Sequence, residues 1–440
     1  GIPEKLLNQQ LDYSQPLPDP DLKNGKTVIY GRILGYDPTH GIALKFNCTD
    51  WLFFDVFGQS VPVVEDGSFR YETNMMLPGE ATLRVGRKRF ELFLMPGGKL
   101  EVTINLPEIF WSESHLFGKK ENGQLIWFEG TYAALNTELV KHAGLMNIYS
   151  ADNFYENICG VTPAQYKKYV TKIYEKNRGE ILKNKSLSDA ARTYMINKLE
   201  MSYFFAIRGY KGNISYAPMI SGKKGVKRAD MTVDESYYDD ILELDFIHSP
   251  YIRYGSYPDF VRAATEDFKG KFEPQPVWED ILRAKPLGST LARLKPLSEK
   301  QMLTLDSISE PEIKKALTVK NKEVMDLLAE SANKTGYTVC QLDTAVTADG
   351  LLAVVTRPYR GKVVLIDMWN TWCGPCMRAM NSLKSVKEEL KDVVYVYIAD
   401  ESSPEGKWKI TIPDIHGIHY RITNEQSSAL GKLYEYPGIP

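Results

Sequence analysis

The stretch that decides the fold is residues 363–376, which read VVLIDMWNTWCGPC. Its first part, residues 363–368, is a short apolar run with β-branched side chains, which is typical of a buried strand. Residues 376–390 carry apolar side chains at helical spacing, and residues 393–398 form a second short apolar run. A strand, a helix and a strand joined by a crossover of this length predict a βαβ unit with a parallel sheet.

Two cysteines stand where that helix begins. Cys373 would sit where unpaired backbone N–H groups and the helix dipole favour a negative charge, so we expect it to be the nucleophilic thiolate. Cys373 would attack a client disulfide, and Cys376, one helical turn further on, would resolve the mixed disulfide. Gly374 would let a partner chain approach closely, and Pro375 falls in the first helical turn, where its missing N–H costs little. No cofactor other than a Cys373–Cys376 disulfide is expected.

A metal site is the alternative for closely spaced cysteines. A thiolate zinc site needs four ligands, and the five cysteines of this chain include only one Cys-x-x-Cys pair. Cys48, Cys159 and Cys340 are scattered, and we expect them to be small buried hydrophobes. His416 and His419 are three residues apart without a carboxylate-rich motif, and we interpret both as loop or surface residues. We therefore expect no metal.

Residues 363–376 resemble the strand and active site of thioredoxins almost position by position. The preceding Arg-Gly-Lys at 360–362 and the Thr371-Trp372 pair are more similar to the thiol:disulfide oxidoreductases of the TlpA/ResA type, which are tethered to membranes or lie in the cell envelope. This resemblance implies protein thiol and disulfide clients, an unidentified envelope electron donor, and a location in the periplasm or on the outer surface, with a lipid anchor as one option.

The resemblance also implies roles for further residues. Asp367 lies six residues before Cys373, where thioredoxins carry a buried acid. Burial should raise the pKa of this carboxyl, which could then accept the Cys376 proton during resolution; a carboxylate that only makes hydrogen bonds is the alternative. Trp369 and Trp372 would pack against the active-site loop and shape the approach to it, with ordinary core packing as the alternative for Trp369.

The last residues, 434–440, read YEYPGIP and resemble the thioredoxin segment whose cis-proline faces the disulfide. By this resemblance, Pro440 would be that proline. A cis bond between Ile439 and Pro440 is plausible because proline nearly removes the preference for a trans peptide bond. The backbone of Ile439 before it would pair with an extended client peptide. Because thioredoxin domains continue past this proline with two strands and a helix, we expect an incomplete domain in this chain.

The pattern of side chains divides the chain into four segments and predicts a multidomain α+β fold. Strands of period two, such as the one with Leu100, Val102 and Ile104 on its apolar face, predict an antiparallel β-sandwich. Capping-box spacings at 162–165, 232–235 and 298–301 predict helices after it. The segments are an extended lead-in at 1–27, the β-sandwich at 28–106, a mainly helical domain at 107–332 and a thioredoxin-like domain at 333–440.

The bulk composition excludes several functions. The formal net charge of −2 argues against a general binder of nucleic acids or anionic membranes. No apolar run approaches the roughly 18 residues that a transmembrane helix needs. Five sparse cysteines do not make a disulfide-stapled scaffold.

Two functions of different classes remain. The first is a thiol–disulfide oxidoreductase, with the Gly-Pro dipeptide of reducing thioredoxins favouring a reductant. The second is an envelope docking protein whose N-terminal domains hold a client or a glycan, with the thioredoxin part secondary. A peroxiredoxin-like peroxidase is disfavoured because the Pro-x-x-x-Thr-x-x-Cys pattern is missing.

Overall fold

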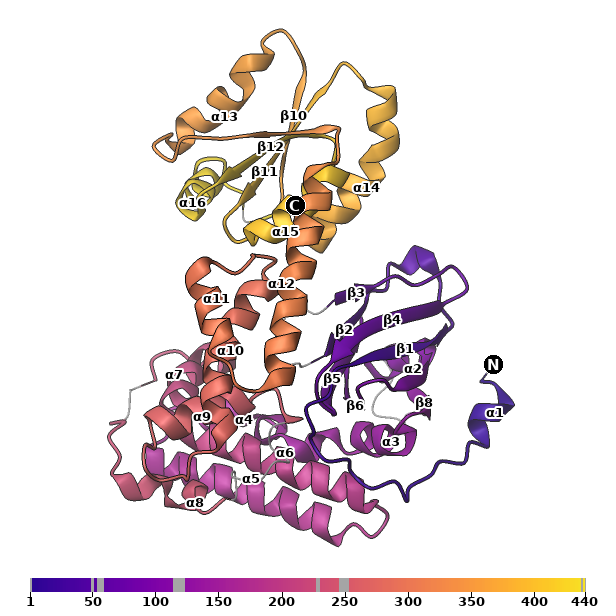
Figure 1. Cartoon of the computed structure of the whole chain (residues 1–440), viewed down its shortest axis with the longest axis vertical. Coiled ribbons are helices and arrows are strands. Elements are labelled where there is room, and N and C mark those ends of the chain that lie inside the picture. Colours follow the sequence, from indigo (N-terminus) through magenta and orange to yellow (C-terminus); the bar gives the residue numbers. More distant parts are fainter. Residues whose placement is uncertain are drawn as a thin grey trace. The chain divides into compact units, whose positions relative to one another are not determined.

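The chain folds into two compact units in a computed structural model that describes residues 2–48, 51–53, 59–113, 123–226, 230–244, 253–436 and 438–439. Unit 1 comprises residues 1–285 and 309–313, and unit 2 comprises residues 286–308 and 314–440. Figure 1 traces the elements of each unit.

Unit 1 contains two four-stranded sheets that share one hydrophobic core. Buried side chains of both sheets meet in it, among them Ile29 and Val102 of the first sheet and Leu83 and Phe90 of the second. The first sheet has the order β4 (Ser68–Met75), β1 (Gly25–Leu34), β7 (Lys99–Asn105) and β8 (Ile126–Gly130). The second has the order β3 (Gln59–Val61), β2 (Leu44–Cys48), β5 (Gly79–Val85) and β6 (Lys88–Leu94).

The β region differs from its prediction in two respects. Its last strand, β8, lies beyond the expected boundary at residue 106 and pairs with β7. The expectation of a purely antiparallel arrangement is wrong, because β1 and β7 pair in parallel. These two strands are far apart in the sequence, so no tight hairpin dictates their relative direction. The expected extended lead-in also contains a short helix, α1 (Glu4–Leu7).

Unit 1 also contains many helices. The capping box of Thr162 with Gln165 begins helix α5 as expected, and the box of Ser298 with Gln301 begins α11 in unit 2. The predicted box at Thr232 is wrong: its N–H donates to Asp230 in a turn. The α-helices are α2 (Leu106–Glu113), α3 (Ala133–Lys141), α4 (Phe154–Asn157), α5 (Pro163–Lys183), α6 (Asp189–Arg208), α7 (Tyr210–Ser221), α8 (Asp239–Leu242), α9 (Tyr257–Glu266) and the start of α10 (Pro276–Ala292). Short 3-10 helices span Pro38–His40, Ala143–Met146, Ile148–Ser150 and Glu235–Tyr238.

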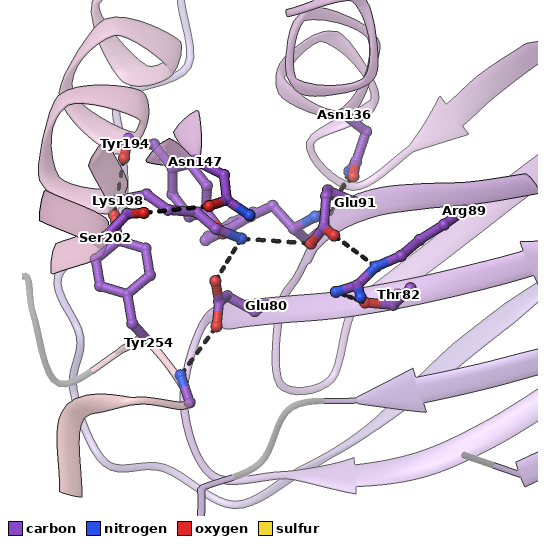
Figure 2. A network of polar contacts seen from close by, with 12 residues as sticks. Glu80, Thr82, Arg89, Glu91, Asn136, Asn147, Tyr194, Lys198, Ser202 and Tyr254 are labelled. Carbon is purple, nitrogen blue, oxygen red and sulfur yellow. Dashed lines mark hydrogen bonds and ion pairs between the residues drawn. The ribbon is translucent and has the colours of Figure 1, made fainter. Parts of the chain in front are cut away.

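A buried charge network joins the second sheet to helix α6, as Figure 2 shows. The Lys198 Nζ lies 2.5 Å from a Glu80 carboxylate oxygen and 3.3 Å from a Glu91 oxygen. The three side chains are only 19%, 12% and 23% exposed. Burial alone would lower the pKa of Lys198, but the two carboxylates outweigh it and raise the pKa. The ammonium therefore stays charged and links the β and helical parts of unit 1.

Unit 2 begins inside helix α10 and contains α11 (Glu299–Asp306) and most of α12 (Pro311–Ala332). The structure therefore does not divide the chain at the expected boundary of 332/333. These helices belong to unit 2 because their connection at Leu294 packs against the first turn of α15 (Glu405–Thr411), where a side chain at Gly406 would collide with the Leu294 carbonyl. An ion pair of 2.9 Å between Lys334 and Asp414 adds a second connection.

A parallel four-stranded sheet forms the centre of unit 2. Its order is β10 (Val364–Met368), β11 (Val394–Asp400), β12 (Gly417–Ile422) and β9 (Tyr337–Cys340). Helices α13 (Ala348–Thr356), α14 (Gly374–Glu389) and α16 (Asn424–Leu433) pack on it, and 3-10 turns span Arg357–Tyr359 and Ile412–Asp414. The predicted βαβ unit at residues 363–398 is confirmed by β10, α14 and β11.

Alternation along β11 separates the two faces of this sheet. Tyr397 and Ala399 face a cluster that includes residues of α14 and α15, whereas Val396 and Ile398 face a cluster with α13 and α16. Figure 1 shows α14 on one side of the sheet and α13 and α16 on the other. A sheet covered on both faces explains why its central strands are continuous apolar runs.

The charge network of unit 1 makes a prediction about stability. Lys198→Met would remove the cation between the Glu80 and Glu91 carboxylates, although Glu91 would keep its ion pair with Arg89. Removing one partner of a buried charge cluster typically costs about 3–5 kcal/mol. The transition of unit 1 should therefore move to a clearly lower denaturant concentration in urea unfolding followed by circular dichroism.

Lys176→Met is the matched control, because the pair of Lys176 with Glu180 is 71% and 49% exposed. An exposed pair of this kind contributes about 0–1 kcal/mol. Equal shifts in the two variants would contradict the role given to the buried network.

Candidate active site

The loop between β10 and α14 places the cysteine pair at the start of a helix. Trp369 continues the strand, with its N–H donating to the Ile398 carbonyl at 2.9 Å. Helix α14 then begins at Gly374, with Cys373 as its N-cap. The Cys373 Sγ accepts a hydrogen bond from the Cys376 backbone N–H at 3.2 Å. The sulfur of Cys373 therefore lies where the helix offers its unpaired N–H groups.

Cys373 and Cys376 form a disulfide, with Cα atoms 5.3 Å apart. The two residues are only 3% and 1% exposed. They pack in one apolar cluster with Trp369, Met380 and Tyr397, among others. The disulfide is thus part of the buried core on this face of the sheet.

Three predicted site residues lie on the outer side of this loop. Trp372 is 48% exposed, and its indole N–H donates to the Ser402 hydroxyl at 2.8 Å. Gly374 and Pro375 are exposed in the first turn of α14. A side-chain carbon added at Gly374 would touch only the Arg378 guanidinium, at 3.6 Å. The first turn of α14 therefore leaves space beside Gly374.

Asp367 lies on the face of the sheet that holds the disulfide. It is the register partner of Tyr397 on the neighbouring strand, and register partners point to the same face. Burial raises the pKa of Asp367, an effect that the nearby Lys387 ammonium offsets only in part. Burial likewise lowers the pKa of Lys387. Burial thus shifts the pKa of each group in the direction that favours its neutral form.

The C-terminal prediction can be followed only to Ile439. This residue is half-buried and packs against the cluster that contains both cysteines. Pro440, the expected cis-proline, lies outside the described residues.

His419 corrects the interpretation of this residue as a surface histidine. It is fully buried in β12, its ring stacks on Tyr397 with centroids 5.2 Å apart, and its Nε2 lies 2.7 Å from the Ile415 carbonyl oxygen. Burial lowers the pKa of His419 to about 4, although the hydrogen bond to Ile415 acts in the opposite direction. Ile418, Tyr420 and Ile422 alternate with other residues, which is the pattern of a strand. This pattern in the sequence could have predicted that His419 lies in the strand, on the opposite face from these three residues.

In the described part of the chain, the remaining candidate residues do not form a second site. Cys48, Cys159 and Cys340 are not disulfide-bonded, and they are half-buried rather than fully buried as expected. Within the described ranges, no three His, Cys, Asp or Glu side chains come together as metal ligands would. Of the helices that the structure describes, none combines the length and apolarity needed to cross a bilayer.

Comparison with known proteins supports the identity of the C-terminal region. A family model described as thioredoxin-like matches residues 361–440, which include β10, the cysteine pair, β11 and β12. No curated protein and no solved structure matches the chain. Residues 361–440 are therefore similar to thioredoxin-like domains, in agreement with the resemblance seen at residues 363–376.

His419 makes a prediction about pH. Its folded pKa of about 4 is below the unfolded value of about 6.5, so its contribution to stability is present above pH 6.5 and is lost as the pH falls through 4. The difference corresponds to about 3 kcal/mol. His419→Gln, which does not titrate, should flatten the fall of the unfolding temperature of unit 2 between pH 6.5 and 4, measured by calorimetry. Parallel curves for the two proteins would contradict a buried neutral histidine.

Proposed function

We propose that this chain is a thiol–disulfide oxidoreductase that reduces protein disulfides in a bacterial cell envelope. The observation that carries the proposal is the Cys373–Cys376 disulfide at the N-terminus of α14, directly after the edge strand β10 of the thioredoxin-like region. This placement stabilises a thiolate on Cys373, and a thiolate is the species that attacks disulfides.

The reaction would proceed through a mixed disulfide. The Cys373 thiolate attacks one sulfur of the client disulfide, forms a Cys373–client bond and releases the other client sulfur as a thiolate. Cys376 then loses its proton and attacks the Cys373 sulfur, which releases the second client thiolate and closes the Cys373–Cys376 disulfide. Two electrons pass from the dithiol to the client. An external dithiol donor must then reduce the protein again.

Asp367 would be the base in the second step. Its carboxylate lies on the face of the sheet that packs the disulfide, and burial raises the pKa of Asp367 towards the range where proton transfer is efficient. Lys387 would limit this shift, because its ammonium favours the ionised carboxylate. Burial and Lys387 thus act on the pKa of Asp367 in opposite directions, and the effect of burial is the larger.

The client would bind over the exposed side of the active-site loop. Trp372 offers an exposed indole, and Gly374 and Pro375 leave space beside it. The backbone at Ile439 would add an extended client segment through main-chain hydrogen bonds, the role that the resemblance assigns to the residue before the cis-proline at Pro440.

The direction of electron flow and the location rest on sequence features. The Gly374-Pro375 dipeptide is that of reducing thioredoxins, which supports a reductant. The similarity of residues 360–362 and of Thr371-Trp372 to the TlpA/ResA type supports the periplasm or the outer surface, with an envelope dithiol protein as the electron donor.

A cavity in unit 1 favours docking of a client as a second function. It has a volume of about 1090 Å³ and is lined by the start of α5 and by residues 230–240, including Lys168, Lys172 and Asp234. Clefts of this size hold ligands in many proteins. In this view the two N-terminal sheets, which we take to be a β-sandwich, and the helices of unit 1 would select the client that the cysteine pair reduces.

A redox titration tests the main function. The protein equilibrated with dithiothreitol and glutathione buffers should show one two-electron transition well below the glutathione couple, followed by thiol labelling and mass spectrometry. Cys373→Ser should abolish it. A transition at or above the glutathione couple would make the protein an oxidant or isomerase, and a pair that cannot be reduced reversibly would leave the docking function.

Removal of the proposed base should slow the reaction. Asp367→Asn keeps the shape of the side chain but cannot accept the Cys376 proton, so reduction of a model disulfide at pH 7 should slow by at least about tenfold. The wild-type rate should fall as the pH drops through the raised pKa of Asp367, because the carboxylate becomes protonated. The variant should lack this dependence, and an unchanged rate at pH 7 would exclude Asp367 as the base.

A further inference from the structure

The loop that carries the cysteines is held from behind by two buried polar residues. Asn370 lies between Trp369 and the cysteine pair, and Ser403 lies in the loop after β11. They are 3% and 0% exposed, respectively. Because neither side chain reaches the surface, neither can contact a client in this structure.

Asn370 joins the active-site loop to the end of β11. Its side-chain oxygen accepts one hydrogen bond from the Asp400 backbone N–H at 3.1 Å and another from the Ser403 hydroxyl at 2.8 Å. The backbone oxygen of Asn370 accepts the N–H of Cys373 at 2.9 Å. Asn370 is therefore bonded both to the loop after β11 and to the backbone of Cys373.

Ser403 completes this arrangement with a second bond to the active-site loop. Its oxygen accepts the Thr371 backbone N–H at 2.9 Å while its hydroxyl donates to Asn370. Its own N–H donates to the Asp400 carbonyl at 3.1 Å. A buried hydroxyl and a buried amide whose hydrogen bonds are mutually satisfied make a rigid connection, since any movement of the loop would break several bonds in a dry environment.

The Asp400 side chain makes hydrogen bonds that hold the loop after β11 in place. The Asp400 carboxylate accepts hydrogen bonds from the backbone N–H of Ser402 at 2.9 Å and from the Ser427 hydroxyl at 2.8 Å. Burial would raise the pKa of Asp400, but hydrogen bonds from Ser402, Ser427 and Asn370 hold it below its ordinary value. These hydrogen bonds therefore favour the ionised form of Asp400 at the end of β11.

We propose that Asn370 and Ser403 are positioning residues that hold the Cys373 sulfur at the N-terminus of α14 and thereby set the reactivity of the cysteine pair. This inference rests on the proposed redox function. Its physical basis is the bond from the Cys376 N–H to the Cys373 Sγ, at 3.2 Å, which stabilises a thiolate only while the loop from Asn370 to Cys373 keeps its position.

The variants Asn370→Ala and Ser403→Ala test this inference in the full chain. Ser403→Ala removes a single oxygen atom, so it provides the measurement if Asn370→Ala does not fold. Ser427→Ala is the matched control, because it removes a hydroxyl bonded to the same Asp400 carboxylate but makes no bond to the active-site loop.

Two readouts separate positioning from loss of stability. The first is the pH profile of iodoacetamide alkylation of the reduced protein, with the alkylated cysteine identified by mass spectrometry. The second is the equilibrium constant with dithiothreitol. Loss of one hydrogen bond that supports the thiolate should slow alkylation of Cys373 at pH 7 by about threefold to tenfold and shift the profile to higher pH. The equilibrium should move towards the disulfide by a similar factor, because the reduced form loses stabilisation.

The outcomes distinguish this inference from the proposed function. Shifts in Ser403→Ala, with Ser427→Ala close to wild type, would support it. Wild-type values in Ser403→Ala, or equal shifts in Ser427→Ala, would overturn the inference and leave the redox function intact. A wild-type protein without any reversible transition would overturn both.

Discussion

The constraint on which unit 2 depends is the burial of a parallel sheet on both faces. Because β11 carries apolar side chains on both sides, helices must cover both, and the chain must leave β10 and return as a helix before it can form β11. This crossover places the N-terminus of α14 beside the carboxyl end of β10. The disulfide lies at that junction, where a strand end, a loop and a helix start meet.

The same burial that forms the core also sets the chemistry beside the disulfide. Asp367 and Lys387 lie on a face that is mostly apolar, so desolvation moves both towards neutrality. Burial also favours the neutral form of His419, which stacks on Tyr397, and lowers its pKa to about 4. Asp400 shows the opposite outcome, because enough hydrogen-bond donors surround it to keep the carboxylate charged. The environment of each group therefore decides the direction in which its pKa shifts from the ordinary value.

The two proposed functions need different parts of the chain, and they are compatible. The redox chemistry requires only the junction of β10 and α14 with its supporting loops. Unit 1 has no Cys-x-x-Cys pair, but its Lys198 network links the second sheet to α6, and its cavity is the place where we propose that a client docks. In this proposal, one unit that binds and a second unit that reacts would divide recognition from chemistry within one chain.

The sequence by itself determined the local features: the strand at 364–368, the helix after Cys373, the second strand of the βαβ unit and the capping boxes at Thr162 and Ser298. These depend on side chains within a few residues of one another, whose periodicity and spacing can be read directly. Only the tertiary structure decided the parallel pairing of β1 with β7, the joining of α11 and α12 to unit 2, the burial of His419, and the hydrogen bonds between Asn370 and Ser403. Each of these joins segments distant in the sequence, and the free energy that selects them comes from burial and hydrogen bonding in the assembled core, which local propensity does not encode.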